Sequence, residues 1–280
     1  MAKLLARRRG IRFGFWLEQP FPASTFRRVV RDVMIERALR GADFVWTAGP
    51  RALAIYETLM RDRGRLHVLP YGQDLSKNFA FSRKYPSAND PIRFLFSGKY
   101  MHRNNIWELL SAFRALREQY GPRAELVLSG YSGMDNSVRA HISADAVLSG
   151  AVSHDTDFET WDDRLRPFRN ADVLCMPGVH AGWGLIVPEA MSLGMPVICG
   201  NGIESALMLV RPSVDGFIVG ASYLQIGDAM KRFLEQPQLL EDYGRSARER
   251  ARICDAPNVA MRFMELLSPL LAETSKSYPS

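Results

Sequence analysis

The sequence predicts an α/β protein in which the strands of parallel sheets are joined by helices. Short apolar runs of strand type alternate with stretches of helical apolar period over most of the chain, and parallel strands with crossover helices produce this pattern. A stretch rich in Pro, Gly, Ser and Asn, residues 70–91, interrupts the alternation. We therefore expect a small first α/β domain and a larger, doubly wound second domain.

The first domain is expected to contain both strands and helices. An apolar and aromatic run predicts a strand at Ile11–Leu17. Over Thr25–Arg40 the apolar residues follow the helical period, with arginines on the opposite face. Pro50 suits the first position of a helix that continues over Ala52–Leu59. Further strands are expected at Asp43–Thr47 and Leu66–Leu69.

The second domain is expected to be a longer alternation that ends in helices. Its strands are predicted at Ile92–Phe96, Ala124–Leu128, Ala146–Leu148, Ala171–Met176, Pro196–Cys199 and Gly216–Val219. Its helices are predicted at Ile106–Tyr120, Ser137–Ser143, Leu165–Arg169, Leu185–Leu193, Gln225–Leu234, Leu239–Ile253 and Ala256–Leu271. The resulting division is a partial first domain at 1–80, a hinge at 81–90, a ligand-binding domain at 91–255, and a C-terminal helix and tail at 256–280.

The composition is that of an ordinary globular protein. Hydrophobic residues are 47% and charged residues 24% of the 280 residues, so a core can form without disulfide or metal staples. No apolar run reaches the roughly 18 residues of a membrane-spanning helix. Cys175 and Cys199 end strand-like runs, Cys254 has no metal-like spacing to them, and the histidines form no ligand pair. We expect buried free thiols, no metal, and a reducing cytoplasm.

Positive charge is concentrated at the beginning of the chain. Residues 1–65 carry 14 Lys and Arg against 6 Asp and Glu, a balance of +8, whereas the remainder carries 22 against 24, a balance of −2. Such a segment favours an anionic surface or ligand, or it is a solvated basic face. It lacks aromatic residues interleaved with basic ones, and no helix-turn-helix or zinc pattern occurs, so specific nucleic-acid binding is not expected.

Glycine-bearing loops follow four of the predicted strands. In an open parallel sheet, ligands bind beyond the carboxyl ends of the strands, where glycine lets the backbone approach a phosphate. Four such loops at one sheet edge predict a ligand crevice. Neither G-x-G-x-x-G nor the P-loop follows any strand, which argues against a nicotinamide oxidoreductase and an NTPase. The loops are Ser97–Lys99, Ser129–Gly133, Gly182–Gly184 and Gly200–Gly202.

Three charged residues lie at or near these loops. Lys99 ends a strand loop and Arg103 follows just before a helix, so the two suit a diphosphate, although two exposed basic residues would give the same pattern. Glu189 lies in an otherwise apolar helix start, where acids are rarely buried without a partner. Its carboxylate could accept hydrogen bonds from a ribose 2′,3′-diol, or it could complement the helix dipole.

Longer motifs resemble a known family. They are GADFVWTAGPRALAIY (41–56), HVLPYGQDLSKNF (67–79), FLFSGKYMHRNNIWELLSAF (94–113), ADVLCMP (171–177) and AGWGLIVPEAMSLGMPVI (181–198). Together they resemble the retaining glycosyltransferases of family 4 (group 1), from about Glu18 to the C-terminus. The resemblance implies a GT-B-like α/β fold, with a complete Rossmann-like, doubly wound C-terminal domain and a truncated N-terminal α/β domain.

The resemblance also implies a nucleotide-diphosphate sugar as donor, bound by residues 91–255 without a metal or other cofactor. Carried over position by position, Glu189 holds the ribose, and Lys99 with Arg103 neutralises the leaving diphosphate, which lowers the barrier. The remaining donor-binding positions are Gly98, Gly130, His180, Gly182, Trp183, Gly184 and Leu185.

Three departures from the family pattern bear on activity. Ala181 replaces the first acid of the family's Glu-x7-Glu pair, which contacts the donor sugar; His180 beside it could substitute or be a bystander. Asn104 stands where the family has its phosphate-binding lysine, one residue after Arg103. The chain before the hinge is much shorter than the family's first domain, whose early strands form the acceptor side of the cleft.

The expected activity is a retaining sugar transfer to a glycan or lipid-linked acceptor in polysaccharide or cell-envelope glycan biosynthesis. The alternative is a non-catalytic nucleotide-sugar-binding remnant, or one half of a split glycosyltransferase. The basic helix at 25–40 could lie on an anionic membrane at its inner, cytoplasmic face, or it could pack on the first sheet as an ordinary amphipathic helix.

Overall fold

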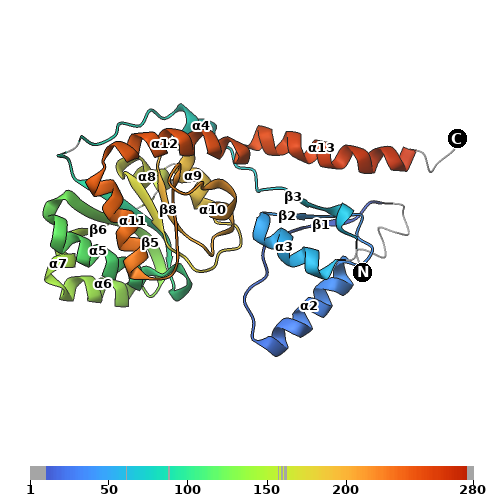
Figure 1. Ribbon diagram of the computed structural model, residues 1–280, viewed down its shortest axis with the longest axis horizontal. Helices are drawn as coiled ribbons and strands as arrows, with labels where there is room; N and C mark the ends of the chain where they lie inside the picture. The colour runs from blue at the N-terminus through green and yellow to red at the C-terminus, as the bar shows by residue number, and fades with distance from the viewer. Residues whose placement is uncertain are drawn as a thin grey trace. The chain divides into compact units, whose positions relative to one another are not determined.

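The computed structural model describes residues 11–60, 62–87, 89–156, 158, 160 and 163–275, and these form two compact α/β units (Figure 1). The first unit comprises the residues up to Asp74 together with those from Ile253 onward, and the second comprises Leu75–Arg252. Both units are built on parallel sheets, as the sequence predicts. Within the described part of the chain, no helix is long and apolar enough to span a membrane.

The first unit has one parallel sheet with helices on both faces. The strand order is β1-β2-β3. Val45 of β2 packs with the core under α2 and α3, whereas the next residue, Trp46, packs with Val259 and Phe263 of α13. Since neighbouring strand residues face opposite sides of a sheet, α13 covers the face opposite α2 and α3. The elements are β1 (Gly14–Leu17), α2 (Thr25–Leu39), β2 (Phe44–Thr47), α3 (Pro50–Leu59), β3 (Leu66–Val68) and α13 (Ala256–Ser275).

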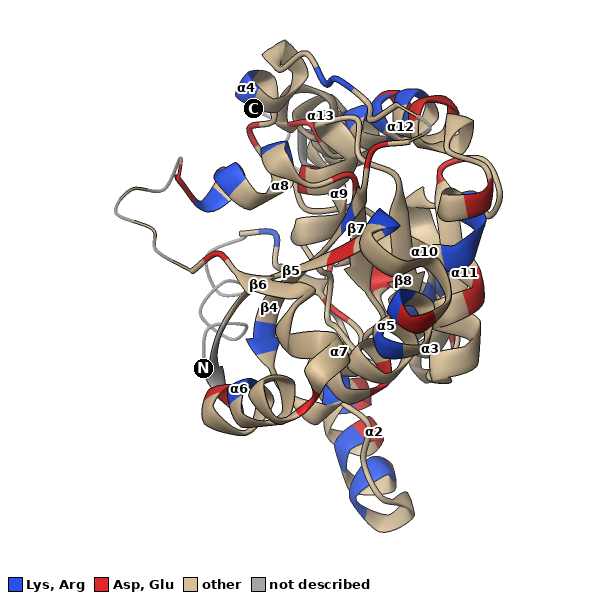
Figure 2. Ribbon diagram, turned by 90° about the vertical axis from the view of Figure 1, so that its left-hand side faces the viewer, with Lys and Arg blue, Asp and Glu red and all other residues tan. Residues whose placement is uncertain are grey.

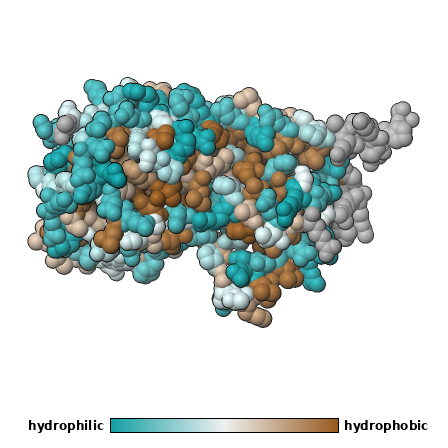
Figure 3. All heavy atoms as spheres, in the orientation of Figure 1, coloured by the Kyte–Doolittle hydropathy of each residue, from teal (hydrophilic) through white to brown (hydrophobic). Residues whose placement is uncertain are grey.

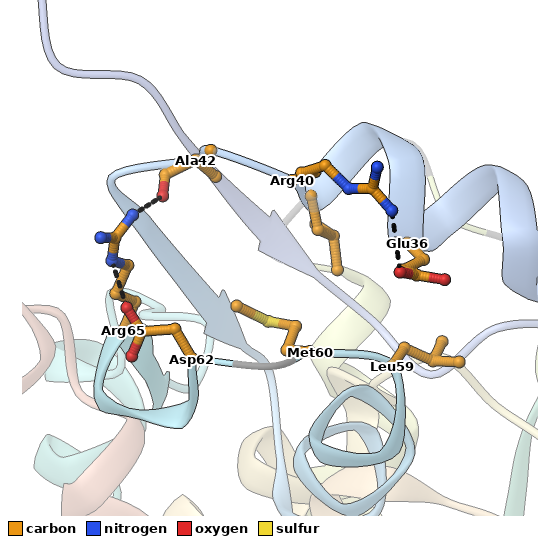
Figure 4. Close-up of a pocket in the computed structure, with 9 residues that line it drawn as sticks. Glu36, Arg40, Ala42, Leu59, Met60, Asp62 and Arg65 are labelled. Atoms are coloured by element: carbon orange, nitrogen blue, oxygen red, sulfur yellow. Dashed lines mark hydrogen bonds and ion pairs between the residues drawn. The ribbon is translucent and has the colours of Figure 1, made fainter.

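A small cavity of about 130 Å³ lies in the first unit, where α2 ends and β2 begins (Figure 4). Leu59 and Met60 contribute apolar side chains to it. Arg65 crosses its rim, donating to the carbonyl of Ala42 at 3.0 Å and pairing with Asp62 at 2.8 Å. Arg65 therefore ties the segment before β3 to the start of β2.

The second unit is a six-stranded parallel sheet in the order β6-β5-β4-β7-β8-β9, with helices on both faces (Figure 1). The order runs outward in one direction from β4 and in the other from β7, which is the doubly wound topology that the sequence predicts. Its strands are β4 (Ile92–Tyr100), β5 (Ala124–Gly133), β6 (Val152–His154), β7 (Val173–Met176), β8 (Val197–Gly200) and β9 (Gly216–Val219). Its helices are α4 (Ser76–Ala80), α5 (Ile106–Tyr120), α6 (Asp135–Ala144), α7 (Ala146–Ser149), α8 (Arg166–Asn170), α9 (Ile186–Ser192), α10 (Glu204–Leu209), α11 (Tyr223–Glu235) and α12 (Gln238–Ala251).

The segment after α4, in which the sequence analysis places a hinge, belongs to the second unit and is held to the rest of it by partly buried hydrogen bonds. Arg83 donates from Nε to the carbonyl of Leu193 at 2.8 Å and from Nη1 to that of Ala171 at 2.6 Å. Tyr85 donates its hydroxyl to the carbonyl of Gly194 at 2.9 Å. Burial lowers the pKa of Arg83, but an arginine remains charged even so. Its guanidinium donates to carbonyls at the C-terminal ends of the helices α8 and α9.

One predicted strand is wrong. Residues Ala146–Ser149 form the short helix α7, because the carboxylate of Asp145 accepts hydrogen bonds from the backbone N–H groups of Val147 and Leu148 at 2.8 and 3.0 Å and caps a helical turn. The edge strand β6 follows at Val152–His154 instead. The prediction of buried free thiols is confirmed for Cys175, Cys199 and Cys254.

Asp215 anchors the segment before β9. Its side chain is fully buried at 0% exposure. The carboxylate accepts hydrogen bonds from Arg211 Nε at 2.9 Å and Nη2 at 2.8 Å, and from Ser246 Oγ of α12 at 2.7 Å. Burial acts to raise the pKa of Asp215, but these hydrogen bonds outweigh it and leave the pKa below its usual value. The carboxylate therefore joins α12 to the edge of the sheet.

Replacing this carboxylate should destabilise the protein. We expect Asp215→Ala to lower the free energy of unfolding by about 3 kcal/mol, because buried charged hydrogen bonds are lost. Urea unfolding followed by circular dichroism measures the change. The control is Glu241→Ala, which removes an exposed partner of Arg245 on the same helix and should cost less than about 1 kcal/mol. Equal losses for the two variants would contradict the anchoring role.

Candidate functional site

The strand order of the second unit reverses between β4 and β7, and ligands of doubly wound sheets bind beyond the carboxyl ends of the strands at such a point. Two loops meet there. The backbone N–H of Val179, after β7, donates to the carbonyl of Arg103, after β4, at 2.8 Å. Three of the residues with predicted roles, Arg103, His180 and Gly182, therefore lie on contacting loops. Lys99, which the sequence analysis places in a loop, lies in β4, because this strand continues to Tyr100.

The end of β4 and the loop after it carry basic side chains. Lys99 of β4 and Arg103 of the loop are both exposed, and the helix α5 begins at Ile106. Asn105 precedes it in the left-handed conformation with φ of 59° and donates through Nδ2 to the carbonyl of Ala221 at 3.0 Å. Arg103 thus comes shortly before the N-terminus of a 15-residue helix, an arrangement that favours an anion.

Asn104, which the resemblance aligns with the family's phosphate-binding lysine, stabilises the backbone of the loop after β4. It is 7% exposed, and its Nδ2 donates to the carbonyl of Lys99 at 2.7 Å. The side chain therefore closes the loop on itself and brings no charge to the crevice. The basic groups near this loop are those of Lys99 at the end of β4, Arg103 and the neighbouring His102.

Glu189 lies in the first turn of α9 and is 9% exposed. Its Oε1 accepts a hydrogen bond from Nη2 of Arg164 at 2.9 Å. Its backbone carbonyl accepts from Ser192 Oγ at 2.7 Å and from Asn78 Nδ2 of α4 at 3.4 Å. The carboxylate is therefore a nearly buried, paired anion, and α4 and α9 fix the backbone that carries it.

The sequence analysis missed Arg164. This residue belongs to a single 3-10 turn, Asp163–Leu165, that precedes α8. Its partner Glu189 is 25 residues further along the chain, so no helical or strand period relates the two. The only signal in the sequence was the buried acid itself, which requires a cationic or hydrogen-bonding partner somewhere in the fold.

The glycine loop after β7 packs against residues that follow β8, Ile203 and Ser205. Gly184 has φ of +94°, and a Cβ there would lie 2.8 Å from Ile203. The carbonyl of Gly184 accepts from Ser205 Oγ at 2.8 Å, and that of Trp183 accepts from the Ser205 N–H at 2.9 Å. Trp183 is 2% exposed, whereas Leu185 is 47% exposed. The buried indole therefore anchors the loop, and Leu185 beside it is exposed to solvent.

Gly98 and Gly130 lie side by side on β4 and β5. A Cβ at Gly130 would lie 2.4 Å from the Tyr100 ring and 2.5 Å from the carbonyl of Gly98. Close packing of Tyr100 therefore requires glycine at position 130, whatever ligand this sheet edge binds. Gly98 has φ of +143°, a conformation that favours glycine.

Polar side chains gather beyond the carboxyl ends of β4, β5 and β6. Arg139 Nε pairs with Asp135 Oδ2 at 3.0 Å. Tyr100 OH, Asp135 Oδ1 and His154 Nδ1 are buried and have no hydrogen-bond partner among the described residues. Burial, with the nearby Asp135 charge, raises the pKa of Tyr100 to about 12, while burial and the Arg139 charge lower that of His154. Across the described ranges, no three His, Cys, Asp or Glu side chains are placed to hold a metal ion.

Comparison with known proteins matches most of the second unit to one family. The family described as "Glycosyl transferases group 1" matches residues 78–250. D-inositol 3-phosphate glycosyltransferase of Paenarthrobacter aurescens is 29% identical over 202 residues, which are 66% of this chain and 47% of that protein. The chain thus spans about half the length of this curated relative.

Solved structures of similar fold extend over both units. Sucrose-phosphate synthase from Thermosynechococcus elongatus has a TM-score of 0.76 at 21% identity, over 97% of this chain and 71% of that one. HepE of Anabaena, solved with UDP, has a TM-score of 0.78 at 15% identity, over 96% of this chain and 75% of that one. At these identities the similarity establishes the fold, which is the GT-B fold that the sequence resemblance implies.

The half-buried His154 of the polar cluster should make stability depend on pH. Because burial lowers the pKa of His154 below 6.5, the unfolded chain takes up a proton that the folded protein resists, so stability should fall as the pH drops below about 7. His154→Asn should remove part of this loss, as measured by urea unfolding between about pH 7.5 and 5.5. The exposed His102→Asn serves as control and should keep the wild-type pH dependence. An unaltered dependence in His154→Asn would contradict the assignment.

Proposed function

The chain belongs to the group 1 glycosyltransferase family, and we propose that it is a transferase that moves a sugar, with retention, from a nucleotide-diphosphate sugar to a glycan or lipid-linked acceptor. The observation that carries the proposal is the nearly buried carboxylate of Glu189 in the same sheet-edge region as the exposed cations of Lys99 and Arg103. A ribose diol and a diphosphate are the two groups that these charges suit.

A nucleotide donor is supported by a structural neighbour. HepE of Anabaena has been solved with UDP, with UDP and glucose, and with UDP-glucose. In this chain, Glu189 would accept the ribose hydroxyls, and Lys99 and Arg103 beside α5 would neutralise the diphosphate. The backbone around Leu185, together with Gly98, Gly182 and Gly184, would approach the donor sugar, and His180 and Gly130 would complete the lining.

The chemistry follows from where charge develops. The bond between the sugar anomeric carbon and the diphosphate oxygen breaks while the acceptor hydroxyl forms its bond on the same face. The acceptor proton passes to the departing phosphate oxygen. Lys99 and Arg103 would stabilise the negative charge that grows on the leaving diphosphate, which is a transition-state effect. No residue has to act as a metal ligand or as a covalent nucleophile in this scheme.

The donor site can be tested by calorimetry with UDP, GDP and ADP, and by turnover with their sugars. Glu189→Ala should weaken nucleotide binding by about 1.5–3 kcal/mol, the range for hydrogen bonds to a charged group. Glu118→Ala, which removes an exposed partner of Arg114, should leave binding unchanged. Unchanged binding in Glu189→Ala, with the fold intact by circular dichroism, would refute the ribose role. Clear nucleotide binding without any turnover would favour the non-catalytic alternative.

We also propose that α2 lies on an anionic membrane at its inner, cytoplasmic face, close to a lipid-linked acceptor. Leu39 is the buried residue of α2, and Ile35 packs on the same core. The rest of its apolar face is exposed, and Figure 3 shows hydrophobic side chains on this helix. The exposed fractions are 79% for Phe26, 56% for Val29, 45% for Val30, 45% for Val33 and 66% for Met34. Packing on the first sheet therefore leaves this face uncovered by the described residues.

The same helix carries several basic residues, as Figure 2 shows for α2. Arg27, Arg28 and Arg37 are exposed, and no carboxylate in the described part of the chain pairs with them. Apolar side chains between unpaired cations are the pattern of a helix that lies in the interface of an anionic bilayer. The charge selects anionic lipid over a neutral surface.

Vesicle co-sedimentation tests this surface. The protein should bind vesicles of phosphatidylcholine with phosphatidylglycerol and bind pure phosphatidylcholine weakly. Arg27→Gln should weaken binding to the anionic vesicles by about fivefold, since each cation contributes about 1 kcal/mol, and Phe26→Asp should weaken it further. Leu224→Asp, at a residue of α11 with 61% exposure, is the control. Wild-type binding in both α2 variants, or equal binding to the two vesicle types, would refute the membrane surface.

A further inference from the structure

The ion pair between Arg164 and Glu189 joins two segments that are distant in the sequence. Arg164 Nη2 lies 2.9 Å from Glu189 Oε1, and the two side chains are 38% and 11% exposed. A carboxylate as buried as that of Glu189 would lose its charge, or turn toward water, without such a partner. The guanidinium therefore stabilises the charged form of Glu189 inside the fold.

The geometry also limits the directions in which Glu189 can accept further hydrogen bonds. A carboxylate offers about four acceptor sites on two oxygens, and a guanidinium approaches them in a fixed plane. The backbone of Glu189 is held independently, because Ser192 and Asn78 donate to its carbonyl. The hydrogen bonds to the backbone carbonyl and the guanidinium at Oε1 both restrict the orientation of the carboxylate.

We infer that Arg164 is a positioning residue for nucleotide recognition, which acts through Glu189 and does not itself select the ligand. This inference rests on the proposed donor site. Arg164 would hold the carboxylate charged and oriented so that it accepts hydrogen bonds from both ribose hydroxyls. The specificity that depends on Arg164 is then the preference for a ribose over a deoxyribose, and not the attraction of the diphosphate.

The chain provides a matched control two residues away. Arg166 pairs with Asp155, which follows β6, and its side chain is 45% exposed. It thus shares with Arg164 the local segment, the residue type and a carboxylate partner, but the partner is not on α9. A loss that comes from disturbing the segment around α8, or from removing one positive charge, should appear in both variants.

The experiment is calorimetric titration with a nucleoside diphosphate and its 2′-deoxy and 3′-deoxy forms, using the base that binds the wild type. The wild type should prefer the ribose form by about tenfold or more. Arg164→Ala should lose most of this preference, because its affinity for the ribose form falls about tenfold while that for the deoxy forms changes little. Arg164→Lys, which keeps the charge, should recover part of the preference, and Arg166→Ala should behave as the wild type.

The outcomes separate the inference from the donor site on which it rests. If Arg164→Ala and Arg164→Lys keep the wild-type preference for ribose, or if all three ligands weaken equally, Arg164 does not act through Glu189 and the inference is overturned while the donor site stands. Equal loss in Arg166→Ala would also overturn it. A wild type that binds none of the nucleoside diphosphates would overturn the donor site and this inference together. Circular dichroism of each variant establishes that it is folded.

Discussion

The arrangement of the second unit depends on one constraint, the contact of backbone with backbone where the loops after β7 and β8 meet. A Cβ at Gly200 would lie 2.0 Å from the carbonyl oxygen of Gly178, and one at Gly202 would lie 1.9 Å from that of Val179. Only glycine permits this approach. Because these two backbone segments are in contact, the N–H of Ala181 donates to the carbonyl of Gly202 at 3.0 Å. This hydrogen bond holds the loop that carries Trp183 and Gly184 against the loop after β8. Glycine is thus required at positions 200 and 202 for backbone packing, independently of any ligand.

Arginine has different tasks in the two units. In the second unit, Arg83, Arg248 and Arg250 donate to backbone carbonyls that have no partner within their own elements, so the residue serves as an internal cap with several donors. In the first unit, arginines of α2 remain on the surface beside apolar side chains. Part of the basic excess of the sequence therefore lies on α2, where Arg27, Arg28 and Arg37 pair with no carboxylate among the described residues.

The sequence predicts elements that have a strong local hydrophobic period. It does not predict structure or contacts that depend on a residue distant in the sequence. The helix at Ile106–Tyr120 is found with the predicted bounds, since its apolar stripe and the turn at Gly121 are local signals. The strand predicted at Ala146–Leu148 is wrong because one capping carboxylate, that of Asp145, outweighs a short apolar run. The loop-like composition around Arg83 hides three carbonyl partners more than eighty residues away. Glu189 stood out as a buried acid, but Arg164 could not, because only the fold brings it there.

The replacement of the family's first acid by Ala181 changes the charge of the proposed donor site. The backbone at this position is held by the Gly202 carbonyl and by a bridge to Ile203, so the methyl group occupies the place where the family has a carboxylate. In the proposed donor site, the loss of this acid leaves fewer negative charges opposite Lys99, Arg103 and Arg164. Fewer acids would suit the dianionic diphosphate and its growing charge during departure. Recognition of the donor sugar would be weaker, because no carboxylate at position 181 accepts hydrogen bonds from its hydroxyls. Selectivity for the sugar would then depend on backbone groups of the loop around Leu185. The affinity for the donor would depend mainly on contacts with its nucleotide.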